Sequence, residues 1–285
     1  MTKSLREFLT EGKFVLTVEM EPPAGADPSR VLEEIGKLKE DFVAVNIADS
    51  PMASLRMSPI ALAHLIQEKW GLEVIFHLTC RDRNLLGLQA ELLGAAALGV
   101  KNILALTGDP PEGGDHPNST GVFDVDSTGL IKMARSLNQG RAVSGKELTA
   151  PTDFLIGTVA NPTASDLARE VARLERKIEA GADFVQTQPI FAIEQVERFE
   201  QATAHLQVPI LYGILPLKNY RSAKYLAEKV PGINIPDQVV RRVEKEGAEA
   251  GLALARELLL HLRSRAKGAH IFPMGRPDLA LKLVN

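Results

Sequence analysis

Short apolar segments alternate along the chain with longer segments that have helical spacing. Eight apolar segments are rich in β-branched residues and short enough to be buried strands, and they cover residues 14–20, 42–47, 74–79, 102–107, 154–160, 184–188, 209–214 and 270–274. Amphipathic segments between them predict helices over residues 28–40, 58–70, 83–98, 127–138, 165–180, 192–206 and 218–229. Further helices are expected over residues 236–247, 249–266 and 276–284.

Strands that each lead through a short loop into a helix predict a closed (β/α)8 TIM barrel. An open, doubly wound sheet is the alternative, but that fold normally carries a glycine-rich phosphate turn after its first strand. Residues 19–23 read EMEPP at that place, which favours the barrel. No linker or break in composition divides the chain, so we expect residues 1–285 to form a single domain with extra helices before the last strand.

Polar residues gather where the predicted strands end. They lie within residues 19–23, 46–50, 77–80, 107–111, 161–162, 186–189 and 213–216. The carboxyl ends of the strands in such a barrel meet at one mouth, where catalytic groups concentrate. We therefore expect the functional site at this mouth.

Two segments imitate known ligand-binding motifs without the residues that those motifs need. Residues 140–147 (GRAVSGKE) resemble a P-loop, but Glu147 replaces the Ser or Thr that holds magnesium, and a helix precedes the segment. Residues 124–129 (DVDSTG) resemble the start of a calcium loop, but Arg135 occupies the position that requires a glutamate. The histidines show no metal-binding spacing, so we expect no metal site.

A charged helical segment at residues 169–179 allows two interpretations. Arg173, Arg176 and Lys177 share one side of the helix, because residues i, i+3 and i+4 are neighbours there. The segment is either a solvated helix face or a contact surface for an anionic ligand.

Composition narrows the choice of partners. Lys and Arg total 33 and Asp and Glu total 36, a net charge of −3 that argues against nucleic-acid binding. The single cysteine, Cys80, excludes an intramolecular disulfide and a zinc site built from several cysteines of this chain. No apolar stretch approaches the roughly 18–20 residues of a membrane span. No signal-like apolar run follows the first residues, so we expect a cytoplasmic protein.

Taken together, the strand-end motifs resemble those of the methylenetetrahydrofolate reductase family. The likeness extends over residues 18–276 and is carried by segments 19–23, 77–80, 106–110, 176–182, 187–188, 213–216 and 270–276. The resemblance implies a flavin-containing (β/α)8 barrel, with FAD as the usual flavin and FMN as the alternative. It also implies reduction of 5,10-methylenetetrahydrofolate to 5-methyltetrahydrofolate by ping-pong hydride transfer through flavin N5.

The resemblance assigns roles to individual residues. Glu19 matches the acid that opens the folate ring and Asp109 matches the aspartate beside the flavin, so both are expected to be catalytic and to contact folate. Gln188 and Tyr220 match substrate contacts. Together with Asp109, the expected cofactor contacts are Asn46, His77, Thr107, Gly108, Phe123, Asp126, Asn161, Arg173, Arg176 and Lys177.

An acid needs a pKa near the operating pH. We expect the pKa of Glu19 to be raised by partial burial and by the carboxylate of Glu21, because residues i and i+2 of a strand face the same way.

The chain departs from the pattern of well-studied family members at several positions. Glu21, Asn46, Gly157 and Asn161 stand where those members carry an aromatic residue, Thr, Tyr and His, respectively. The choice between FAD and FMN therefore stays open, as does the electron donor, either NAD(P)H or a partner subunit. We expect a homo-oligomer. The alternatives are a flavin-binding subunit of an electron-transfer complex and a folate or corrinoid methyltransferase on the same barrel.

Overall fold

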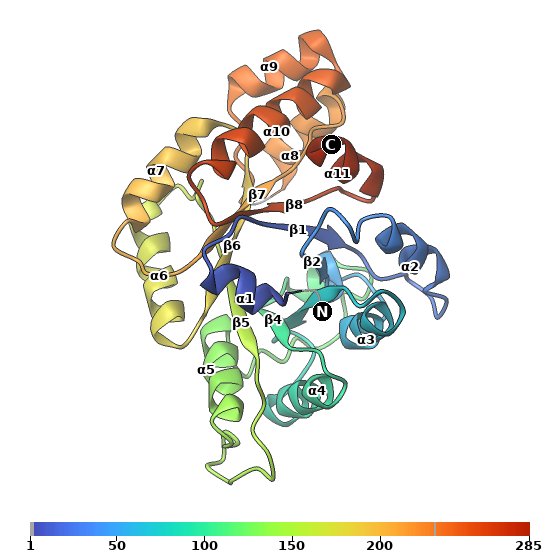
Figure 1. Ribbon diagram of the computed structural model, residues 1–285, viewed down its shortest axis with the longest axis vertical. Helices are drawn as coiled ribbons and strands as arrows, with labels where there is room; N and C mark the ends of the chain where they lie inside the picture. Colours follow the sequence, from blue (N-terminus) through green and yellow to red (C-terminus); the bar gives the residue numbers. More distant parts are fainter. Residues whose placement is uncertain (1–2, 231) are drawn as a thin grey trace.

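The computed structural model describes residues 3–230 and 232–285, and its parallel strands close into a barrel (Figure 1). The strands are β1 (Val15–Met20), β2 (Ala44–Ile47), β3 (Glu73–Thr79), β4 (Asn102–Leu106), β5 (Leu155–Ala160), β6 (Phe184–Ile190), β7 (Ile210–Ile214) and β8 (Gly268–Ile271). Each strand pairs with the next, and β8 also pairs with β1, where Thr17 lies beside His270. The predicted (β/α)8 barrel is confirmed.

Helices surround the strands and fill most of the connections between them. They are α1 (Leu5–Thr10), α2 (Ser29–Gly36), α3 (Pro59–Trp70), α4 (Leu85–Ala97), α5 (Ser127–Asn138), α6 (Leu167–Glu179), α7 (Ile193–Thr203), α8 (Tyr220–Lys229), α9 (Asp237–Glu246), α10 (Ala248–Arg263) and α11 (Pro277–Val284). Helices α8 to α11 gather in the upper part of Figure 1, beside β7 and β8. The extra helices predicted before the last strand are α9 and α10. None of the described helices is long and apolar enough to cross a lipid bilayer.

The ends of the chain differ from the predicted elements. Helix α1 was not predicted, because its six residues are too few to show a period, but Ser4 and Glu7 cap its first turn reciprocally. The last strand begins earlier and ends earlier than predicted. Beyond it, Met274 and Gly275 adopt φ values of 50° and 70°, which turn the chain away from the sheet.

Alternate residues of each strand point into the barrel and form layers there. The lowest apolar layer consists of Val15, Ala44, Ile75, Leu104, Leu155, Phe184 and Leu211, and Leu5 and Leu9 of α1 pack against it. Two residues further along several strands lies a buried polar layer of Thr17, Asn46, His77, Gln186 and His270. Helix α1 thus closes the amino end of the barrel, and polar groups lie below its carboxyl end.

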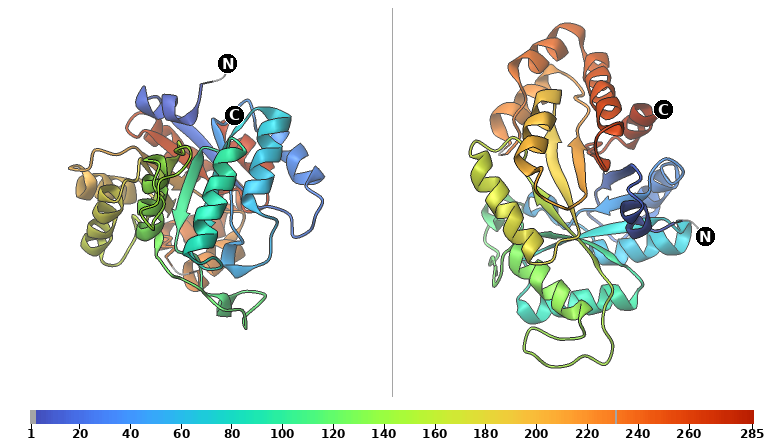
Figure 2. Two further views of the ribbon diagram at one scale, coloured as in Figure 1. Left: turned by 90° about the horizontal axis from the view of Figure 1, so that it is seen from below. Right: turned by 60° about the vertical axis from the view of Figure 1, so that its left-hand side comes forward.

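The segment that imitates a P-loop lies in the connection between α5 and β5, which projects from the barrel (Figure 2). An isolated antiparallel bridge joins Arg141 to Glu147 within it. It forms a turn after a helix instead of the strand-to-helix loop that a phosphate-binding motif requires.

Candidate functional site

A cavity of about 570 Å³ lies at the carboxyl ends of the strands. Most of the predicted site residues line it, and they come from β1, β3, β6, α6 and the segments after β4 and β5. These residues are Glu19, His77, Thr107, Gly108, Asp109, Asn161, Arg173, Lys177 and Gln188. Closure of the barrel therefore brings together groups that are far apart in the sequence.

Two further predicted residues lie next to this cavity. Asn46 is fully buried below it, where its Nδ2 lies 3.0 Å from Nε2 of His77. Tyr220 lines an adjoining groove of about 790 Å³. The groove shares Asn161, Ala164 and Gly232 with the cavity, so the two spaces adjoin.

Phe123, Asp126 and Arg176 line neither the cavity nor the groove as the described residues define them. Asp126 caps α5 by accepting a hydrogen bond of 2.9 Å from the amide of Gly129. Arg176 is exposed on α6. Of the three cations predicted to share a helix side, Arg173 and Lys177 reach the cavity and Arg176 does not.

A chain of hydrogen bonds crosses the barrel below the cavity. The side-chain amides of Asn46 and Gln186 bond each other in both directions, at 2.6 Å and 3.2 Å. Gln186 Nε2 also donates to Thr17 Oγ1 at 3.2 Å. Thr17 Oγ1 lies 2.8 Å from Nδ1 of His270. Because these side chains are buried and mutually bonded, the network holds the imidazoles of His77 and His270 in place.

Glu19 brings a carboxyl group into the cavity from β1, with Oε2 3.9 Å from Nε2 of His270. Burial by itself would raise the pKa of this carboxyl. The interactions with His270 and His77 outweigh burial, and the pKa of Glu19 is lowered. The prediction of a raised pKa is therefore wrong for the free protein.

Glu21 is not the neighbour of Glu19 that the strand pattern predicts. Strand β1 ends at Met20, so alternation no longer controls where the next side chain points. The Glu21 side chain is 48% exposed and lies 3.2 Å from a guanidinium nitrogen of Arg56. The titratable neighbours that act on the pKa of Glu19 are the imidazoles of His270 and His77 and not a second carboxylate.

His77 is buried, and this burial lowers its pKa to about 4. The imidazole is therefore neutral at pH 7. Asn46 Nδ2 faces His77 Nε2, so this ring nitrogen is the acceptor and the proton resides on Nδ1.

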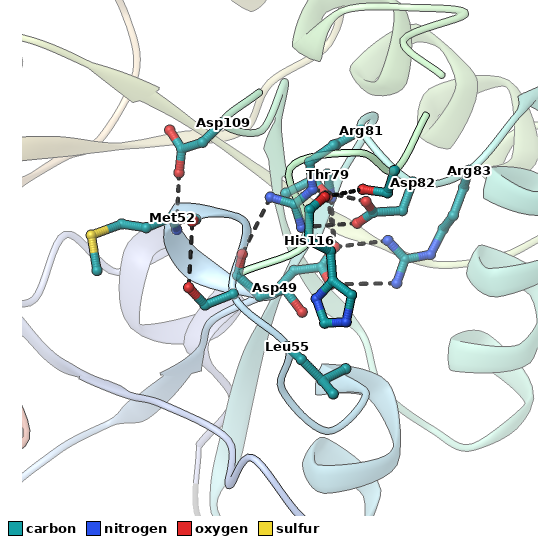
Figure 3. Close-up of polar contacts among 12 residues, drawn as sticks. Asp49, Met52, Leu55, Thr79, Arg81, Asp82, Arg83, Asp109 and His116 are labelled. Atoms are coloured by element: carbon teal, nitrogen blue, oxygen red, sulfur yellow. Dashed lines mark hydrogen bonds and ion pairs between the residues drawn. The ribbon is translucent and has the colours of Figure 1, made fainter. Parts of the chain in front are cut away.

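The loops that follow β2, β3 and β4 are joined by hydrogen bonds and form one part of the rim of the mouth (Figure 3). Asp109 belongs to this rim. Its Oδ2 accepts a hydrogen bond of 3.1 Å from the amide of Met52, in the loop after β2. The preceding Gly108 has a φ of 93°, and a Cβ there would lie 2.9 Å from Cβ of Thr79. Both its backbone angle and its closeness to β3 explain why glycine precedes Asp109.

Asp49 and Arg81 form a second part of this rim, also visible in Figure 3. Asp49 Oδ2 accepts hydrogen bonds from the amide of Thr79 at 2.9 Å and from Arg83 at 2.8 Å. Arg81 is 2% exposed and donates to the carbonyl of Ser50 at 3.2 Å. These bonds join the ends of β2 and β3, and both Asp49 and Arg81 line the cavity.

Lys177 is a buried cation, 2% exposed, at the edge of the cavity. Its ammonium group donates to the carbonyl of Val159 at 2.7 Å, and burial lowers its pKa to about 8. Within residues 3–230 and 232–285 it has no carboxylate within ion-pair distance. A buried ammonium without an anionic partner suits a ligand that supplies negative charge.

Gly157 leaves space in the wall of the barrel that a neighbouring strand fills. A Cβ at this position would lie 2.3 Å from the ring of Phe184. The space that a tyrosine side chain would need is therefore occupied by Phe184 from β6.

Cys80 does not contribute a reactive thiol. It is buried, its Sγ lies 3.4 Å from the carbonyl oxygen of Leu106, and burial raises its pKa to about 12. The described residues contain no cluster of three or more His, Cys, Asp or Glu side chains that could hold a metal.

Thr17, Asp49, Gln186 and His270 were not predicted as site residues, although all belong to the cavity or the network below it. The available signal was strand alternation. Thr17 and Gln186 are polar residues two positions before Glu19 and Gln188, so they point the same way one layer deeper.

The sequence matches the family model described as methylenetetrahydrofolate reductase over residues 4–285. It is 26% identical over 297 residues to 5,10-methylenetetrahydrofolate reductase of Salmonella typhimurium (strain LT2), covering 98% of this chain and 92% of the relative. The protein of the same name from Escherichia coli K12 has the same identity, 26%, and the same coverage.

Solved structures show the same fold. A protein from Clostridium thermocellum, described as binding two copies of 5-methyl-5,6,7,8-tetrahydrofolic acid, has a TM-score of 0.64 and 14% identity, covering 98% of this chain and 96% of that one. Oxaloacetate acetylhydrolase has a TM-score of 0.55 and 14% identity, covering 99% of this chain and 83% of its own. Such low identities show the architecture alone. The match to the family model extends over nearly the whole sequence, and the chain belongs to the methylenetetrahydrofolate reductase family.

Proposed function

We propose that this protein reduces 5,10-methylenetetrahydrofolate to 5-methyltetrahydrofolate with a bound flavin, and that Glu19 is the acid. The observation that carries the proposal is the carboxyl of Glu19 in the mouth cavity of a barrel of this family, beside His270. The same cavity presents Asp109 and Gln188, which suit a cationic reaction centre and a pterin.

The cavity fits a flavin. Its volume, about 570 Å³, lies within the range usual for cofactor sites, and Leu104, Leu106 and Val159 give it apolar walls suited to a flat ring. Lys177 and Arg173 would hold the phosphate groups, which supply the anion that the buried ammonium lacks. The adjoining groove gives the adenosine half of FAD a place, so we propose FAD, with FMN as the alternative. When bound, the flavin supplies a hydride acceptor and donor at N5.

Glu19 supplies the proton that opens the folate ring at N10. In the free protein its lowered pKa keeps it ionised at pH 7. Its side chain is 26% exposed, and a substrate that fills the cavity displaces the remaining water. Desolvation raises the pKa of a carboxyl, so substrate binding itself draws a proton onto Glu19 before transfer.

Asp109 and Gln188 act on the substrate in different ways. Opening of the ring leaves a positively charged iminium carbon, and the fixed anion of Asp109 stabilises that charge. The side-chain amide of Gln188 is exposed and offers both a donor and an acceptor to the edge of a pterin. Donor and folate use the same mouth in turn, which is the ping-pong order. The donor is NAD(P)H or a partner subunit.

The decisive experiment follows the two half-reactions separately, under anaerobic conditions. For Glu19→Gln we expect flavin reduction by the donor to continue and reoxidation by methylenetetrahydrofolate to slow about 1,000-fold. Glu21→Gln is the matched control, because Glu21 lies outside the cavity and should leave both rates unchanged. Normal reoxidation in Glu19→Gln would refute the assignment of the acid.

The visible spectrum of the purified protein tests the flavin itself. A yellow protein whose reduced flavin is reoxidised by methylenetetrahydrofolate supports the reductase. A colourless protein that transfers methyl groups would show a methyltransferase, and a yellow protein inert toward folate would show an electron-transfer subunit.

A further inference from the structure

The donor and the acceptor of each hydrogen bond in the buried network below the cavity can be assigned by counting hydrogens. The Asn46 amide nitrogen has two hydrogens, and they go to Gln186 Oε1 and His77 Nε2. The Gln186 amide nitrogen also has two, and they go to Asn46 Oδ1 and Thr17 Oγ1. Every amide donor in the network is therefore used.

The hydroxyl of Thr17 links the two amides to His270. Its oxygen already accepts from Gln186, and its own hydrogen has Nδ1 of His270, at 2.8 Å, as its acceptor. If Thr17 donates to Nδ1, the ring proton of His270 must be on Nε2. That nitrogen is the one 3.9 Å from the Glu19 carboxylate.

We propose that His270 is a positioning residue for Glu19, fixed by Thr17 and Gln186 so that its Nε2–H faces the carboxylate and sets the pH at which Glu19 takes up a proton. This inference rests on the proposed role of Glu19 as the acid. His270 is not itself the proton source, because in this arrangement it is a neutral imidazole with one hydrogen.

Other titratable groups near Glu19 come from several elements. His77 on β3 is the second imidazole that acts on its pKa. The remaining titratable side chains that line the same cavity are Asp49, Arg81, Asp109, Glu170, Arg173 and Lys177. Of all these groups, only His270 is oriented by a hydrogen-bond chain that begins at the opposite wall of the barrel and ends within 4 Å of Glu19, at 3.9 Å.

The first test needs neither flavin turnover nor folate. Nitrogen-15 spectra of the full chain as purified should show His270 protonated on Nε2 and His77 protonated on Nδ1. Observation of His270 with its proton on Nδ1 would overturn the proposal, whatever any variant does.

The second test measures the titration of Glu19 directly, with carbon-13 in the carboxyl groups and Glu19→Gln to assign the signal. His270→Phe keeps a ring but removes the donor, and we expect Glu19 to titrate about one pH unit higher. Thr17→Val keeps the shape of Thr17 but removes the hydroxyl, and should shift the titration the same way by a smaller amount. An unchanged titration in a folded His270→Phe protein would refute the proposal.

The pH profile of folate-driven flavin reoxidation separates this inference from the proposed function. In His270→Phe the alkaline limb of that profile, where Glu19 loses its proton, should move upward by the same amount as the Glu19 titration. If Glu19→Gln reoxidises normally while the titration shift is present, the function of Glu19 is wrong but the positioning by His270 stands. If Glu19→Gln is slow and His270→Phe has the wild-type profile, the positioning is wrong and the acid stands.

Discussion

Asp109, after β4, holds the backbone of Met52, after β2, at the mouth of the barrel, with 3.1 Å between its Oδ2 and the amide nitrogen. The loop that it holds is unusual, because Ser50, Met52 and Ala53 all have positive φ, at 45°, 53° and 54°. Each such residue costs about 1–2 kcal/mol relative to ordinary backbone. Asp109 therefore has a structural function in addition to its proposed role beside the substrate.

Two substitutions of Asp109 separate these functions. Asp109→Asn keeps an oxygen acceptor for Met52 but removes the charge, and we expect folate-driven flavin reoxidation to slow about 100-fold. Asp109→Ala removes both, and the Met52 amide should also exchange with deuterium about tenfold faster. Equal amide exchange in the two variants would show that the bond to Met52 does not restrain the loop.

Gly108→Ala should destabilise the fold, because the new Cβ would lie 2.9 Å from Thr79 in a backbone conformation with a φ of 93°. We expect a loss of about 3 kcal/mol in the free energy of unfolding, measured by chemical denaturation. Gly113→Ala is the control, since nothing lies within 4 Å of its added Cβ. Its stability should change by less than about 0.5 kcal/mol.

Flavin affinity should fall at alkaline pH because of Lys177. Its pKa in the free protein is about 8, and an anionic cofactor stabilises the charged form, so the pKa rises on binding. Affinity is then constant below pH 8 and falls by up to about tenfold per pH unit above it. Fluorescence titrations of flavin from acid to alkaline pH measure this slope. Lys177→Met should bind more weakly, with no such slope, and a slope that persists in it would assign the effect to another group.

Arg173 and Arg176 should differ although they share a helix side. Only Arg173 lines the cavity. Arg173→Gln should weaken flavin binding about tenfold, the effect of losing one charge-assisted hydrogen bond. Arg176→Gln should bind flavin as the wild type does. The same fluorescence titration compares the two variants. Equal losses of flavin affinity would mean that both arginines contact the cofactor, as the sequence pattern suggested.

His77 should make the fold less stable as the pH falls. The pKa of His77 is about 4 in the folded protein and 6.5, the ordinary value, in the unfolded chain. Between pH 4 and pH 6.5 the unfolded chain therefore binds more protons than the folded protein. The free energy of unfolding therefore decreases as the pH falls below about 6.5, and the loss reaches about 2 kcal/mol at about pH 5. Denaturation curves of His77→Gln should lose this part of the pH dependence, and the same dependence in that variant would contradict the burial argument.

The fold was largely predictable because its signal repeats along the chain. The strands and helices of the barrel, the extra helices before β8, and the family all follow from segments distributed from Glu19 to Arg276. Helix α1 could not be predicted, because one turn and a half gives no period, and what holds it is contact of Leu5 and Leu9 with the barrel interior.

The site was predictable at the level of which strand ends contribute and not at the level of electrostatics. Barrel closure brings Glu19, Asp109, Gln188 and Lys177 to one cavity, as expected. The predicted neighbour of Glu19 was wrong, because Glu21 lies beyond the end of β1 and contacts Arg56. The group beside Glu19 is His270, which is far away in the sequence. Such a contact depends on the register between β1 and β8, which local sequence does not encode.

The closed amino end of the barrel determines where protons come from. Below the polar network lies a layer of hydrocarbon from Val15 to Leu211, sealed by α1, and none of its side chains can carry a proton. In the proposed reaction, each proton that Glu19 gives up would therefore be replaced through the mouth, the route that the substrate itself obstructs. Uptake of a new proton by Glu19 and exchange of ligands would then have to alternate. Slow release of the product would delay both.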